Sequence, residues 1–271
     1  MELQSVDIVT CTGSIADLGA QVLSWQPRGE AEVLYTGSIG EARPGAPVRG
    51  GVPICFPWFG PGRDPGAPHS HGFARSSSWT LIANEIADEA QQVTYRLSHP
   101  SASDDYWPHE YWALLTASFG KELTVSLAVT NLDDRTISYE AALHTYLAVD
   151  DIAAVRLDGL DGVSYVDKTD GGAVKTQVGD LTFAGEVDRV YATAGPVTVL
   201  DGVSGRATVV STSGASHIVV WNPGRVRAAD LVDLVPDGWK RFVCVEAGRV
   251  LDGAVVLEPG QTHTLSTTIR V

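Results

Sequence analysis

Three ionisable side chains lie in apolar stretches of the sequence, where they could transfer protons. His144 lies within Ala-Ala-Leu-His-Thr-Tyr, Glu246 ends Phe-Val-Cys-Val-Glu, and Asp188 lies within Gly-Glu-Val-Asp-Arg-Val-Tyr. In an extended chain alternate side chains share a face, so each of these residues faces away from its immediate neighbours. Burial beside apolar neighbours raises the pKa of a carboxyl group toward neutrality, which a general base requires. Glu246 is therefore a candidate base, with His144 and Asp188 as further candidate site residues.

A proline-rich segment carries the second group of candidates. Seven of the fourteen prolines fall between residues 44 and 68, which excludes a regular helix or a central strand and predicts a loop. Aromatic residues occur there together with Arg49, His71 and Arg75, a mixture suited to lining a pocket. Between residues 43 and 75 there are four arginines and one acidic residue, a balance of +3 in a chain of net charge −14: Arg43, Arg49, Arg63, Arg75 and Asp64. The segment is predicted to bind a small anion.

Each candidate also has a purely structural interpretation. A histidine on a strand is often a hydrogen-bonded core residue, and a glutamate before Ala-Gly is often a turn carboxylate. Asp188 precedes Arg189, an arrangement typical of a surface ion pair. Arg49 or Arg75 could be locked in a carboxylate pair that shapes the loop. The residues alone leave these alternatives open.

The elements that must position these residues are mostly strands. Alternation of apolar with small or polar residues predicts a half-buried strand over Glu122–Asn131. Similar patterns predict strands over Gln92–Ser98, Ser138–Val149, Ala207–Thr212, His217–Trp221, Arg241–Glu246, Ala254–Leu257 and His263–Val271. The best helix candidate is Val226–Val235, closed by Pro-Asp-Gly. The fold class predicted is all-β, a large antiparallel β-sandwich with few short helices.

Composition narrows the class of protein. Hydrophobic residues make up 44% and charged residues 19%, and no linker, repeat or low-complexity tract divides the chain, so we expect one domain over residues 1–271. The acidic balance and the presence of only four lysines argue against nucleic acid or an anionic membrane as partner. The sequence shows no secretory signal and no long apolar stretch, and we expect a cytoplasmic protein. Cys11, Cys55 and Cys244 are widely spaced and are predicted to be reduced, packed thiols.

Several motifs, taken in order, resemble one enzyme family. They are Arg-Gly-Gly-Val-Pro-Ile-Cys-Phe-Pro-Trp-Phe-Gly, His-Gly-Phe-Ala-Arg, Leu-His-Thr-Tyr, Val-Asp-Arg-Val-Tyr, Val-Trp-Asn-Pro and Val-Cys-Val-Glu-Ala-Gly. From about Leu23 to the C-terminus the chain closely resembles the glucose-6-phosphate 1-epimerase branch of the aldose 1-epimerase family. Some relatives carry an amide side chain just before the His-Gly pair, where this sequence has Ser70.

The resemblance implies a galactose mutarotase-like β-sandwich that interconverts the α and β anomers of a hexose 6-phosphate, with glucose 6-phosphate as the expected substrate. It implies that His144 is the general acid and Glu246 the general base. It also suggests that four residues contact the sugar or its phosphate: Arg49, His71, Arg75 and Asp188. We expect the two arginines to bind the phosphate, no metal or other cofactor to be needed, and the protein to be a monomer or a weak homodimer.

Three other functions remain open at this stage. His69 and His71, with His144, could form a cupin-type metal site, although Ala74-Arg75 stands where such a site needs a glutamate. Asp188 and Glu246 could be the carboxylate pair of a glycoside hydrolase, which leaves His144 without an evident role. The chain could also be a sugar-binding domain without catalysis.

Two expectations concern the packing around the site. The aromatic residues of the loop could pack on the sugar or fill the core, and we expect Phe56 and Phe73 in the core. Asp188 is expected to be restrained by Arg189 or by a sugar hydroxyl.

Overall fold

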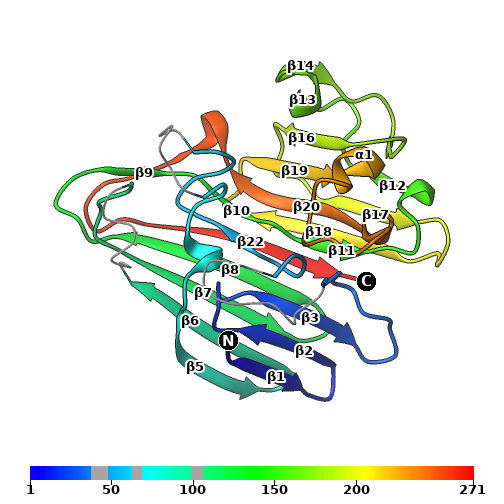
Figure 1. Cartoon of the computed structure of the whole chain (residues 1–271). Coiled ribbons are helices and arrows are strands. Elements are labelled where there is room, and N and C mark those ends of the chain that lie inside the picture. The colour runs from blue at the N-terminus through cyan, green and yellow to red at the C-terminus, as the bar shows by residue number, and fades with distance from the viewer. Residues whose placement is uncertain (38–47, 63–68, 99–105) are drawn as a thin grey trace.

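The structure, a computed structural model, describes residues 1–37, 48–62, 69–98 and 106–271. In this part of the chain the strands form antiparallel sheets of nine, eight, three and two strands. The two large sheets lie face to face, with β20 (Phe242–Arg249) and β10 (Ala141–Leu143) of one packed against β22 (Thr262–Arg270) of the other (Figure 1). The predicted all-β sandwich with few short helices is confirmed.

Most strands of the nine-stranded sheet are buried on one face, as the alternating burial of their residues shows. In spatial order it contains β15 (Leu181–Thr182), β12 (Val155–Asp158), β17 (Val197–Asp201), β18 (Ala207–Ser213), β22, β8 (Leu123–Asn131), β7 (Tyr111–Phe119), β6 (Ala90–Ser98) and β5 (Thr80–Ala87). Every second residue of β8, from Leu123 onward, is buried, and the residues between them are partly exposed. This alternation is the pattern that predicted the strand, because one face packs on the core and the other meets water.

The eight-stranded sheet includes strands buried on both faces. Its order is β14 (Ala173–Thr176), β13 (Ser164–Asp167), β16 (Val187–Tyr191), β19 (His217–Asn222), β20, β10 and β4 (Ile54–Cys55), and β11 (Tyr146–Ala148) also pairs with β20. All of β20 from Phe242 to Gly248 is buried. Val243 and Val245 pack into the core between the sheets, so Cys244 and Glu246 lie on the other face.

The smaller elements flank these sheets. The three-stranded sheet contains β1 (Leu3–Asp7), β2 (Cys11–Ala16) and β3 (Val22–Pro27), and β9 (Ile137–Tyr139) pairs with β21 (Val255–Leu257). The helical elements are α1 (Gly224–Ala228) and the short 3-10 helices η1 (Ala74–Ser76), η3 (Ile152–Ala154), η4 (Lys168–Asp170), η5 (Gly238–Arg241) and η6 (Leu251–Gly253). Within the described ranges no helix is both long and apolar enough to cross a membrane.

Three differences between the predicted and the observed elements bear on the candidate site residues and their surroundings. The strand expected over Arg241–Glu246 continues to Arg249, so Glu246 lies within β20 and not at its end. The strand expected over Ser138–Val149 is interrupted, and His144 lies between β10 and β11. The helix expected over Val226–Val235 is confined to α1, because turns follow at residues 229–230 and 232–233.

Candidate active site

His144 and Glu246 meet because they lie opposite each other across two strands. β10 and β11 pair with β20 in one common register, which places His144 opposite Glu246. Opposed residues share a face, and their side chains are neighbours. Nε2 of His144 lies 3.3 Å from Oε1 of Glu246, and the two side chains are only 10% and 1% exposed.

Burial shifts the pKa values of this pair in opposite directions. Burial raises the pKa of Glu246 well above the usual carboxyl value, and the negative charge of Asp188 adds to the effect. Burial also lowers the pKa of His144 well below the usual imidazole value. Among the described residues, Nδ1 of His144 and Oε2 of Glu246 have no hydrogen-bond partner. These shifts favour a pair that carries one proton in total.

A cavity of about 300 Å³ lies over this face of the sheet. All six residues that the sequence suggested line it: Arg49, His71, Arg75, His144, Asp188 and Glu246. Other lining residues were not predicted: Tyr146, Lys168, Glu186, Val219, Trp221, Arg227 and Leu231. Four of the lining side chains are cationic, in a chain of net charge −14. The cavity therefore combines a buried proton-carrying pair with four cations, which face three lining carboxyl groups: Glu186, Asp188 and Glu246.

A second row of side chains crosses the sheet beside His144 and Glu246. The register pairs Asp188 with Trp221, Trp221 with Cys244, and Cys244 with Tyr146. The ring of Tyr146 stacks on that of His144, with centroids 4.8 Å apart. Alternation along the predicted strand at His217–Trp221 could have placed Trp221 on this face, once the neighbouring strands were known.

Arg49 enters the cavity from the start of the proline-rich loop. Its Nη1 donates to the hydroxyl of Tyr146 at 3.1 Å, and its Nη2 lies 3.0 Å from Oδ1 of Asp233. The guanidinium also lies over the ring of Trp221, 5.8 Å from the centroid. The structural interpretation of a loop arginine in a carboxylate pair therefore holds for Arg49, although it also lines the cavity.

His71 lies in the same loop in a strained backbone conformation, with φ of +67°. The main-chain N–H of Gly60 donates to its Nδ1 at 3.3 Å, so the neutral ring carries its proton on Nε2. Burial, with the nearby charge of Arg75, lowers the pKa of His71 to about 3. The ring therefore stays neutral at physiological pH. Gly72 must be glycine, because a Cβ there would lie 2.0 Å from the carbonyl oxygen of Phe56.

Asp188 is paired with Lys168, which no sequence motif indicated. Its Oδ2 lies 3.0 Å from Nζ of Lys168, the first residue of η4. The expectation that Arg189 restrains Asp188 is wrong, because neighbours on a strand point to opposite faces. The guanidinium of Arg189 instead lies over the ring of Tyr165. No sequence pattern marks Lys168 as a site residue, because it reaches the cavity from η4, a turn between two strands.

The remaining loop residues divide between core and surface. Phe56 and Phe73 are buried in the core, as expected, and Trp58 joins them, whereas Phe59 lines the cavity. His69 is exposed and does not line the cavity, so it does not join His71 and His144. In the described part of the chain no three His, Cys, Asp or Glu side chains are grouped as metal ligands. Two arginines counted in the loop's charge, Arg43 and Arg63, lie outside the described residues.

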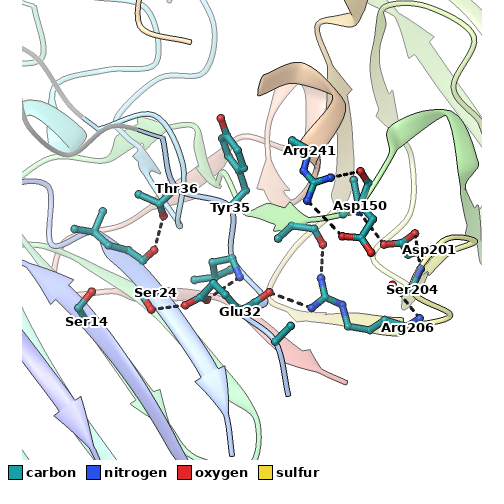
Figure 2. Close-up of a pocket in the computed structure, with 15 residues that line it drawn as sticks. Ser14, Ser24, Glu32, Tyr35, Thr36, Asp150, Asp201, Ser204, Arg206 and Arg241 are labelled. Carbon is teal, nitrogen blue, oxygen red and sulfur yellow. Dashed lines mark hydrogen bonds and ion pairs between the residues drawn. The ribbon is translucent and has the colours of Figure 1, made fainter. Parts of the chain in front are cut away.

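A larger cavity, of about 500 Å³, lies elsewhere (Figure 2). The arginine side chains that line it form hydrogen bonds with other residues of the same lining. Arg206 donates to the carbonyl oxygens of Glu32 and Ala148, and Arg241 donates to the carbonyl and the carboxylate of Asp150. These arginines join separate segments of the chain, so we place the candidate active site in the smaller cavity.

Comparison with known proteins identifies a family match over nearly the whole chain. The family model described as aldose 1-epimerase matches residues 7–270. A candidate glucose-6-phosphate 1-epimerase of Escherichia coli (strain K12) is 34% identical over 273 residues, covering all of this chain and 90% of the relative. One of Salmonella typhimurium (strain LT2) is 37% identical over 249 residues, covering 91% of this chain and 82% of the relative.

Solved structures agree in fold. The crystal structure of a candidate mutarotase, YeaD, from Salmonella typhimurium has a TM-score of 0.92 at 34% identity, over 99% of this chain and 89% of that one. A galactose mutarotase-like protein of Lactobacillus casei is 17% identical with a TM-score of 0.77, over 99% of each chain, and shows the fold alone. The galactose mutarotase-like β-sandwich is thus confirmed.

Proposed function

The chain belongs to the aldose 1-epimerase family and is an isomerase of sugar anomers, and we propose that its substrate is a hexose 6-phosphate, with glucose 6-phosphate preferred. One observation carries the proposal: the His144–Glu246 pair lines a cavity that also holds four cationic side chains. The names of the two bacterial relatives support the same substrate.

The proposed reaction needs one base and one acid beside a single carbon atom. Glu246 takes the proton from the anomeric hydroxyl at O1 while His144 gives a proton to the ring oxygen O5. The C1–O5 bond breaks and C1=O1 forms; after rotation about C1–C2 the ring closes on the other carbonyl face, and both proton transfers reverse. O1 and O5 are both bonded to C1, so the base and the acid must be neighbours, as the 3.3 Å contact allows. Each positioned transfer contributes roughly 10²- to 10⁴-fold.

The pair holds the one proton that this assignment needs, although burial favours the two neutral groups. The reaction requires ionised Glu246 and protonated His144, which together carry the same single proton as the two neutral groups. The positive charges of Lys168 and Arg75 act against the rise in the pKa of Glu246 and so favour its ionised form, whereas the charges of Arg75 and Arg49 oppose protonation of His144. The proton is therefore moved between the two residues without uptake from solvent.

The cationic side chains would bind the phosphate. A hexose 6-phosphate brings up to two negative charges, and the planar fork of a guanidinium forms charge-assisted hydrogen bonds to phosphate oxygens. We assign this role to Arg49 and Arg75, with Lys168 as a third cation. Asp188 and the Nε2–H of His71 are assigned to sugar hydroxyls.

Exchange between the anomers tests the proposal directly. Saturation-transfer NMR would measure the α–β exchange rate of glucose 6-phosphate with and without the protein, and of galactose 6-phosphate and glucose for comparison. We expect acceleration that is greatest for glucose 6-phosphate. Equal or greater acceleration for unphosphorylated glucose would contradict the substrate assignment.

A further inference from the structure

Arg49 is bound by a carboxylate from a distant part of the chain. Its Nη2 contacts Oδ1 of Asp233 at 3.0 Å, and its side chain is only 18% exposed. Arg49 also has a buried Nε with no hydrogen-bond partner among the described residues. A largely buried guanidinium needs a counter-charge nearby, and Asp233 supplies it.

Asp233 itself is weakly held. Its side chain is 49% exposed, and within the described ranges Arg49 is its sole hydrogen-bond or ion-pair partner. It belongs to the turns between α1 and η5, where the side chain of Val232 is fully exposed and Val235 is 47% exposed. Half-exposed ion pairs contribute little to stability, so this carboxylate can be displaced at low cost.

Arg49 and the segment that carries Asp233 both lie beside the cavity. Leu231, two residues before Asp233, lines the cavity, as does Arg49. A phosphate that reached Arg49 would therefore approach the carboxylate of Asp233, and like charges repel. A phosphate dianion offers more charge and more acceptor oxygens than one carboxylate, so it would be the stronger partner of the guanidinium.

We propose that Asp233 is a specificity-determining residue that occupies Arg49 and competes with the phosphate of the substrate for it. The inference rests on the proposed function in one respect, the assignment of Arg49 to the phosphate. Binding is then an exchange of one anion for another, which lowers the affinity for phosphorylated sugars and speeds the release of the product. A neutral sugar does not displace Asp233 and gains nothing from Arg49.

The sharpest test is Asp233→Asn, because asparagine keeps the acceptor oxygen that orients Arg49 and removes only the charge. Asp237→Asn is the matched control. It makes the same change in charge nearby in sequence, at a residue that pairs with Lys240 and does not line the cavity. Asparagine also tolerates the left-handed conformation of Asp237, whose φ is +60°.

Isothermal titration calorimetry would measure the binding of inorganic phosphate, glucose 6-phosphate and glucose to the wild type and both variants. We expect Asp233→Asn to bind both phosphate ligands about two- to fivefold more tightly, the range expected for loss of one half-exposed competing charge. Glucose binding should not change, and Asp237→Asn should match the wild type for all three ligands.

Unchanged or weaker phosphate binding by Asp233→Asn would overturn the inference and assign Asp233 a merely positioning role. The anomer exchange rate is measured separately on the wild type. If exchange is absent but Asp233→Asn still binds phosphate more tightly, the proposed function fails and the competition stands. If exchange is normal and the variant binds phosphate no better, the competition fails and the proposed function stands.

Discussion

His144 and Glu246 face each other across a pair of antiparallel strands, with Nε2 and Oε1 3.3 Å apart on a buried face of the sheet. Their contact depends on sheet register, which fixes it more firmly than two loops could. Burial moves their pKa values in opposite directions, so they act as one proton-carrying unit and not as two independent groups.

Glu246→Gln should lower the enzymatic anomer exchange rate by about 10²- to 10⁴-fold, since the amide cannot accept the proton from O1. Substrate binding should be largely retained, because the size of the side chain is unchanged. Exchange is measured by saturation-transfer NMR, after subtraction of the spontaneous rate, and binding by calorimetry. Glu122→Gln, at an exposed carboxylate paired with Arg270, is the control and should behave as the wild type.

Combining His144→Ala with Glu246→Gln tests whether the two residues form a unit. Each single variant should lose nearly all acceleration, and the double variant should lose little more than either one, because residues that act together are strongly non-additive. Losses that multiply in the double variant would show that the two residues act independently.

The sequence predicted the strands that alternate and the faces on which the candidate residues lie, but not which of them meet. Alternation is a local property, and it correctly put Glu246 on the face opposite Val243 and Val245. Strand pairing is non-local, so the opposition of His144 to Glu246 could not be derived from either segment alone. The prediction that His144 and Glu246 act at one site came from the resemblance to a known family.

Lys168 and Asp233 illustrate what the sequence could not predict. Lys168 reaches the cavity from a short 3-10 turn, and Asp233 reaches Arg49 from turns after a helix that was predicted to be longer. Neither turn has a periodic pattern, because its position depends on contacts with distant strands. By the same reasoning the ion pair between Asp188 and Arg189, one of the alternatives left open, does not form, since strand geometry separates the two side chains.

Arg75→Ala should weaken the binding of glucose 6-phosphate more than that of glucose, by about tenfold or more, if its charge-assisted hydrogen bonds reach the phosphate. Calorimetry with both ligands measures the difference. Arg156→Ala, at an exposed arginine paired with Asp180, removes the same charge away from the cavity and serves as the control. An equal loss for both ligands would place Arg75 at the sugar and not at the phosphate.

Glu246→Gln also tests the proton held by the pair, through the dependence of stability on pH. Burial raises the folded-state pKa of Glu246 above the ordinary value of 4.5 that it takes in the unfolded chain. Between these two values the native protein binds more protons than the unfolded chain, so the free energy of unfolding falls as pH rises, by up to about 1.4 kcal/mol for each pH unit. Glutamine does not titrate and escapes this loss.

The variant should therefore be more stable than the wild type at neutral and alkaline pH, and the difference should shrink as pH falls and vanish below the carboxyl value of 4.5. His144 contributes in the opposite sense, because its lowered pKa makes stability fall as pH drops below its ordinary value of 6.5. That loss arises because the unfolded chain takes up a proton on this histidine. Both proteins retain the histidine, so the loss cancels in the difference between them. Urea denaturation of wild type and variant at a series of pH values measures the difference. A difference that does not change with pH would mean that Glu246 ionises in the folded protein as an ordinary carboxyl group, and it would contradict the raised pKa on which the proton-carrying pair depends.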